Sequence, residues 1–179
     1  NNQIVNEIKK VIGMDYVVLS DSSMIRTCRW NSDVAKKEHA LLSQTADLIV
    51  LIGPHSLQGS LKNQPFAKKN IALGVFSNVL QAIPATPKGT SGIKNFSYIA
   101  PSSHIMAELK QFKKEVDFEH LGIIIDSKTS STLNKQVLGQ YLSNMRDSLN
   151  VKITTHYFDS EQLNSSLAEL PRTIDAVFA

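Results

Sequence analysis

The run Asp47-Leu48-Ile49-Val50-Leu51-Ile52-Gly53 decides the fold class of this chain of 179 residues. An uninterrupted aliphatic run that ends in glycine is typical of a parallel β-strand covered on both faces. The later run His120-Leu121-Gly122-Ile123-Ile124-Ile125-Asp126 has the same character. Together the two runs predict an α/β protein built on parallel sheets.

Helix and strand patterns alternate around these two runs. Apolar residues at helical spacing predict helices, and runs rich in β-branched and aromatic residues predict strands. Proline and glycine predict a long irregular loop over residues 79–95. The patterns predict helices at 4–12, 33–46, 55–63, 102–115, 131–150 and 160–170, and strands at 16–19, 47–53, 70–76, 96–100, 120–126, 151–158 and 175–179.

The order of elements repeats along the chain. Helix 4–12, strand 16–19, helix 33–46 and strand 47–53 match the four elements from residue 131 to the end of the chain. The repeat predicts two Rossmann-like lobes, each a βαβαβ unit with right-handed crossovers. We expect a first lobe at residues 1–116, whose opening strand would precede residue 1, and an incomplete second lobe at residues 117–179.

Composition excludes several function classes. With 42% hydrophobic and 20% charged residues the chain is globular, and its 19 Lys and Arg are scattered, which argues against a nucleic-acid surface. Cys28 is the sole cysteine, so an intrachain disulfide and a cysteine-based zinc site are excluded. No apolar run reaches the ~18 residues of a membrane helix. The chain begins inside a helical pattern, so the missing signal peptide does not identify the native compartment.

Polar side chains follow the predicted strands at their carboxyl ends, where open parallel sheets bind ligands. Hydroxyl groups, free backbone N–H groups and helix N-termini suit a small polar or anionic ligand. Serine is also an ordinary helix N-cap, so several of these serines are expected only to cap helices. The candidate ligand-binding residues are Ser20, Asp21, Gly53, Pro54, His55, Ser56, Ser77, Asn78, Ser102, Asp126 and Ser127.

The sequence contains few features that would indicate an enzyme. Phosphate-loop, zinc-protease and nucleophile-elbow motifs are absent, so we expect no catalytic residue, no cofactor and no metal. Asp21 and Asp126 are placed in different lobes, which argues against a paired-carboxylate mechanism. His55 is either a ligand contact or base, or a histidine at a helix start. Trp30 either stacks on a ligand or fills the edge of a lobe.

Four segments carry a resemblance to a known family: the run at residues 47–54, Lys69 to Val75, Lys88 to Ile93, and Glu119 to Asp126. Their succession resembles the ABC-transporter substrate-binding family of tryptophan and tyrosine type, with a periplasmic-binding-protein type I-like fold. It looks closer still to a branch associated with outer-membrane efflux operons. The chain departs from the family pattern at Ser91.

The resemblance implies two lobes that close on a ligand in the cleft between them. Residues 53–56 would line the first lobe, Ser77 and Asn78 would follow the next strand, and Asp126 and Ser127 would face them. It implies a non-catalytic solute-binding protein of an ABC-type uptake system, periplasmic or otherwise extracytoplasmic. Its partners would be a small polar or amino-acid-like ligand and an ABC permease, with no nucleic acid and with membrane contact only through an anchor outside this chain.

Two alternatives remain open. The same fold could serve as the ligand-sensing domain of a signalling protein, for which a transmembrane helix after the fold would be the sign. An α/β enzyme of transferase type is the other alternative, and a bound nucleotide or measured turnover would support it.

Overall fold

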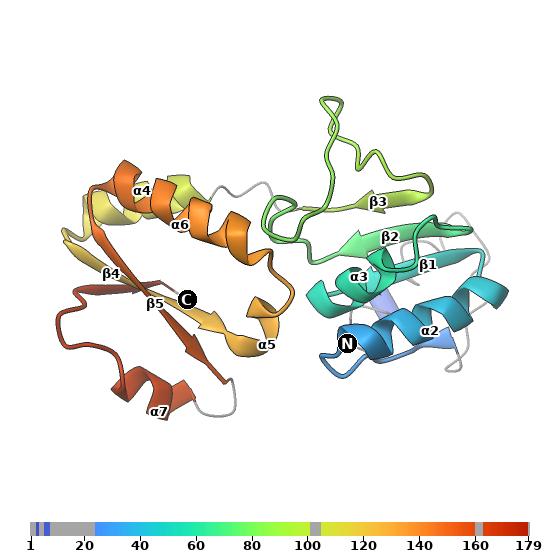
Figure 1. Cartoon of the computed structure of the whole chain (residues 1–179), viewed down its shortest axis with the longest axis horizontal. Coiled ribbons are helices and arrows are strands. Elements are labelled where there is room, and N and C mark those ends of the chain that lie inside the picture. The colour runs from blue at the N-terminus through green and yellow to red at the C-terminus, as the bar shows by residue number, and fades with distance from the viewer. Residues whose placement is uncertain (1–2, 4–5, 8–23, 101–104, 160–162, 179) are drawn as a thin grey trace.

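The computed structural model describes residues 24–100, 105–159 and 163–178, together with Gln3, Asn6 and Glu7. These residues form two separate three-stranded sheets in which the described strand pairs are all parallel (Figure 1). The α/β class and the parallel sheets predicted from the sequence are therefore confirmed. Strand 16–19 and most of helix 4–12 lie outside the described residues.

The first sheet has the strand order β1-β2-β3, and the second has the order β5-β4-β6. We call the two bodies built on these sheets the first and second lobes. The strands of the first lobe are β1 (Leu48–Ile52), β2 (Lys69–Leu73) and β3 (Phe96–Tyr98). Those of the second are β4 (His120–Asp126), β5 (Lys152–Phe158) and β6 (Ala176–Phe178).

Helices lie between most of the consecutive strands, as is usual for parallel pairs. In the first lobe they are α2 (Ser32–Thr45) and α3 (Pro54–Leu61). The later helices are α4 (Ile105–Glu115), α5 (Ser127–Ser130), α6 (Lys135–Leu149) and α7 (Leu163–Ala168). Between β2 and β3 the chain forms turns and bends, as the proline and glycine content of residues 79–95 predicted.

Each lobe has its own hydrophobic core. Side chains from β1, β2 and α3 form the first cluster with Phe66 and Phe96. Leu109 of α4, Met145 of α6 and Leu121 of β4 belong to the second cluster. Leu109 is fully buried there, although the predicted boundary after residue 116 assigns α4 to the first lobe. The side chains of α4 thus pack on the second sheet.

The coverage of the strands differs from the expectation for residues 47–53. β1 alternates between buried and partly covered residues, and Leu48 is exposed, so the prediction of a strand covered on both faces is wrong for this segment. β4 fits that description better, because its first five residues are all buried. The reason is position: β4 is the central strand of its sheet, between β5 and β6.

Candidate ligand site between the lobes

The carboxyl ends of β1 and β4 meet at the junction between the lobes. α3 follows β1 and α5 follows β4, and Figure 1 shows these two helices on facing sides of the junction. The Gln58 side chain donates to the Ser131 carbonyl at 3.4 Å, and the Asn134 N–H donates to the Leu80 carbonyl at 2.9 Å. The strand ends that the sequence marked for a ligand are therefore brought to one place.

Local backbone chemistry directs His55 toward this junction. Gly53 ends β1 with a φ of +86°, a conformation that side chains other than glycine rarely adopt. Pro54 then starts α3 at the first helical position, where its missing N–H costs nothing. His55 is the next residue and is 3% exposed.

Among the described residues, His55 differs from the buried histidines His39 and His120. His39 contacts Asn70 and Asn63 through its two ring nitrogens, at 2.8 and 3.0 Å. His120 likewise uses both nitrogens, on the Thr173 carbonyl and the Thr154 hydroxyl. The Nδ1 atom of His55 is buried and has no hydrogen-bond partner among the described residues. Buried polar groups in folded proteins are normally satisfied, so this nitrogen requires an explanation.

The second lobe supplies the immediate electrostatic surroundings of His55. Burial lowers the pKa of His55 below its ordinary value. The main chain of Lys128 and the carboxylate of Asp126 act in the opposite direction, because both favour the protonated ring. At neutral pH the imidazole is therefore neutral and can accept a hydrogen bond at one nitrogen.

Asp126 presents a second unsatisfied atom at the same junction. Its Oδ1 caps α5 by accepting the Thr129 N–H at 2.7 Å. Its Oδ2 is buried and has no partner in the described part of the chain. The Lys128 ammonium, two residues along the chain, lies 3.7 Å from Asp159.

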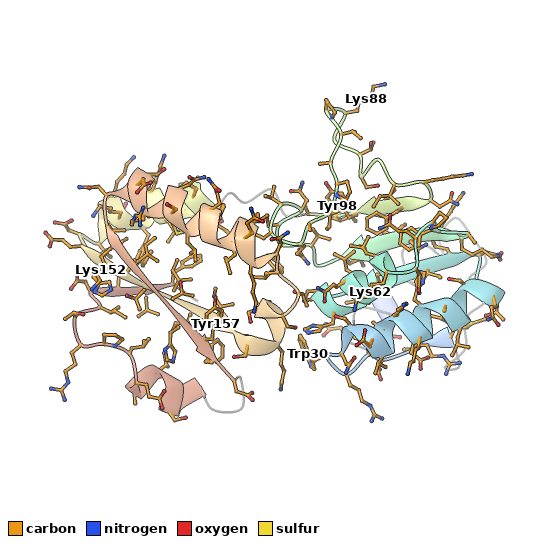
Figure 2. All side chains as sticks on the ribbon, viewed as in Figure 1. Trp30, Lys62, Lys88, Tyr98, Lys152 and Tyr157 are labelled. Atoms are coloured by element: carbon orange, nitrogen blue, oxygen red, sulfur yellow. The ribbon has the colours of Figure 1, made fainter. Side chains whose placement is uncertain are left out.

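Trp30 lies beside His55. The two ring centroids are 5.6 Å apart and the ring planes meet at 85°. Trp30 is nevertheless 63% exposed, and Figure 2 shows it at the junction of the two lobes. Arg29 and Trp30 both have positive φ values, 47° and 58°, which residues with side chains seldom adopt in succession. The exposed indole does not fill a lobe interior, which leaves it available to a ligand.

The remaining predicted residues have mixed surroundings. The Ser56 hydroxyl donates to the carbonyls of Ile52 and Gly53, and the Ser77 hydroxyl accepts the Leu80 N–H. The Asn78 carbonyl accepts the Ile83 N–H, and the Ser127 carbonyl accepts the Ser131 N–H. These groups serve the local loops. Ser20, Asp21 and Ser102 lie outside the described residues.

Apolar side chains that the sequence did not single out also lie at the carboxyl ends of the strands. Val79 follows β2, Ile99 follows β3, and Tyr157 is next to last in β5; all three are more than half exposed. Ligand sites commonly combine apolar walls with a few polar groups. The strand pattern located these residues, but their exposure depends on how the loops fold.

Two surface hollows lie at the opposite, amino ends of the strands. One is lined by residues of β2 and by Thr90 to Ser97, and the other by Glu119, Arg146, Asp147, Asn150, Val151 and Lys152. Neither contains His55 or Asp126. Because the unsatisfied polar atoms lie at the carboxyl ends, we place the candidate site at the junction.

Searches for metal ligands and for membrane spans give negative results within the described ranges. No group of three or more His, Cys, Asp or Glu side chains there is arranged to hold a metal ion. None of the helices in residues 24–100, 105–159 and 163–178 is long and apolar enough to cross a membrane.

Comparisons with known proteins give one distant structural likeness. No protein-family description and no curated protein matches the sequence. The structure is similar to the ligand-free, open structure of a substrate-binding protein with adhesive properties from Clostridium difficile, with a TM-score of 0.42 and 13% sequence identity. The match covers 82% of this chain and 48% of that one, so this chain spans about half the length of the protein it matches.

Proposed function

We propose that this chain is a solute-binding module of an ABC-type uptake system, acting outside the cytoplasm, that holds a small ligand between its lobes without chemistry. One observation carries the proposal. His55 Nδ1 and Asp126 Oδ2 are buried and have no hydrogen-bond partner among the residues that the structure describes, and they come from the carboxyl ends of two different sheets.

The energetics of burial support a ligand at this place. A buried polar atom without a partner costs about 1–3 kcal/mol, and more when it carries charge. Two such atoms at one junction are explained if a ligand supplies the missing hydrogen bonds. The exposed Trp30 beside them adds an apolar surface, so the junction has the mixed character of a small-molecule site.

The division into lobes supports a hinged mode of binding. We propose two lobes divided in the sequence at residues 1–116 and 117–179, except that α4 packs on the core of the second lobe and would move with it. Separate cores allow the lobes to move as bodies, and closure on a ligand is a common use of such a division. An ABC permease is the partner that this role implies.

A thermal-shift screen tests the proposal. Amino acids, amines, nucleosides and small acids are added to the whole chain, and a ligand at 100 times its dissociation constant should stabilise the fold by about 2.7 kcal/mol. The Asp126→Asn and His55→Gln variants should lose the stabilisation. Asp147→Asn is the matched control, because this exposed carboxylate lies at the opposite end of the second sheet.

Two outcomes would contradict the proposal. The first is the absence of stabilisation by any compound. The second is stabilisation that survives both junction variants and is lost in Asp147→Asn, because the ligand would then bind at the amino ends of the strands.

A further inference from the structure

We propose that the ligand of this junction is a small organic cation, a primary ammonium group on an apolar body, with the ammonium at Asp126 and the body against Trp30. The inference rests on the proposed function and names the chemical class of its ligand. The serine-rich strand ends suggested a small polar or anionic ligand, and the inference departs from the anionic alternative.

The charge at Asp126 sets the sign of the ligand. An ionised carboxylate only accepts hydrogen bonds, and a single bond from the Thr129 N–H satisfies Oδ1. The buried Oδ2 needs a donor, and an ammonium group supplies both donors and the opposite charge. In the described part of the chain Asp126 forms no ion pair, and the ammonium of Lys128 is directed at Asp159.

The described residues at the same place offer an anionic ligand few hydrogen-bond donors and an unfavourable charge. The N-terminus of α5 is already occupied by the Asp126 side chain, and this helix has only four residues. At the start of α3, Pro54 has no N–H to donate. A carboxylate or phosphate placed between these helix starts would instead meet the negative charge of Asp126, which repels it.

His55 fits the same ligand. Its ring is 3% exposed and its Nδ1 lacks a partner, so it offers one more buried position for a hydrogen bond. A neutral imidazole nitrogen accepts an N–H from an ammonium group, which carries several donors. An ammonium group carries enough donors for an atom from each lobe.

Trp30 supplies the surface for the apolar body. Its indole touches His55 while most of the residue remains exposed. A cation beside an indole is attracted to the ring face, and an apolar body gains by covering the ring. The backbone at Arg29 and Trp30 holds left-handed conformations. Such conformations are found at ligand clamps.

The test uses matched compounds on the whole chain, measured by titration calorimetry. Three apolar bodies (isobutyl, cyclohexylmethyl and 2-phenylethyl) are each supplied with a primary ammonium, a hydroxyl or a carboxylate group. We expect at least one ammonium compound to bind, and its hydroxyl and carboxylate counterparts to bind at least ~10-fold more weakly. A ratio of this size corresponds to one charged hydrogen bond.

Variants assign the contacts. Asp126→Asn should lower the affinity for the ammonium compound at least ~10-fold, and Trp30→Leu should lower it several-fold. Asp147→Asn should leave this affinity unchanged. Circular dichroism checks that each variant is folded. The comparison among the three head groups uses only the natural chain, so it decides the sign of the ligand even if a variant fails to fold.

The outcomes separate the two proposals. A hydroxyl or carboxylate compound that binds as tightly as its ammonium counterpart overturns the cation assignment but leaves a ligand site at the junction. The cation assignment is also overturned if the ammonium compound binds tightly and the Asp126→Asn variant binds it with the same affinity. If neither these compounds nor the wider screen yields a binder, the proposed function itself fails.

Discussion

His55 links the junction to pH. Burial lowers the pKa of its ring in the folded chain, so between that pKa and the ordinary value of 6.5 the unfolded chain holds more protons than the folded one. The free energy of unfolding should therefore decrease as the pH falls from 7.5 through 6.5 and below. Asp126 and the Lys128 main chain favour the charged ring and reduce the effect without reversing its direction.

The measurement is the melting temperature between pH 7.5 and pH 5. In the His55→Gln variant the decrease toward low pH should be smaller than in the natural chain. Ser97→Ala, an exposed substitution that leaves every titratable group in place, is the control and should keep the natural slope. An unchanged slope in His55→Gln would show that other groups cause the decrease.

Ser91 has a structural role that its place in the sequence does not reveal. Its buried hydroxyl donates to the Phe96 carbonyl at 2.7 Å and accepts the Ile93 N–H at 3.2 Å. Ser91→Ala leaves both main-chain groups without this partner and should lower the free energy of unfolding by about 1–3 kcal/mol. Urea denaturation measures the loss. Ser97→Ala, at an exposed position in β3, should change stability by less than about 0.5 kcal/mol.

At the residue scale, the sequence placed His55 and Asp126 correctly at strand ends but could not show that each has an unsatisfied atom. That property depends on which groups the opposite lobe brings near, and these lie some seventy residues away along the chain. Serine gave a weaker signal, because the same hydroxyl caps a loop or contacts a ligand. The Ser56 and Ser77 hydroxyls bond to nearby main chain.

Among the elements, the contact between α2 and α3 depends on Gly59. A Cβ atom at this position would lie 2.5 Å from the Ala35 Cβ and 2.8 Å from the Lys36 nitrogen, and would also clash with the Ser32 carbonyl oxygen. Gly59→Ala should force the helices apart and destabilise the chain by about 1–3 kcal/mol. Thermal or urea unfolding measures the change.

Gly139 provides the opposite case for the same substitution. It lies in α6, and a Cβ atom there would meet nothing within 4 Å. Gly139→Ala should therefore stabilise the chain by about 0.5–1 kcal/mol, because alanine loses less conformational entropy in a helix. Equal effects of the two substitutions would contradict the described packing of α2 on α3.

Element boundaries show where pattern reading succeeds and where it fails. β4 begins and ends as predicted, because aliphatic residues and a polar end define it on both sides. The predicted helix at 131–150 is wrong at its start: α5 ends at Ser130, and α6 begins after Asn134, whose side chain accepts the N–H groups of Gln136 and Val137. Similarly, Asn31 caps α2, which begins at Ser32, one residue before the predicted start at residue 33. Several polar residues near each start could cap, and tertiary contacts select one.

The whole molecule combines two cores through a polar junction. The alternation of helices and strands predicted parallel sheets. A strand–helix–strand repeat with β4 at its centre produces the observed order β5-β4-β6. The sequence could not predict how the lobes face each other. The hydrogen bonds that cross the junction involve the carbonyls of Leu80 and Ser131, and main-chain groups carry no signature in the side-chain pattern.

Separate cores predict separate unfolding. Because the two clusters share no residue, we expect the lobes to unfold at different urea concentrations rather than in one transition. Leu57→Ala removes a buried side chain from the first core and Leu149→Ala removes one from the second, each at a cost of about 2–5 kcal/mol. Pulsed hydrogen exchange with mass spectrometry, across a urea series, follows peptides from β1 and β4 in the same sample. Each variant should lower the midpoint of its own lobe and leave the other nearly unchanged. If both sets of peptides shift together in both variants, the lobes form one cooperative unit and hinge closure loses its structural basis.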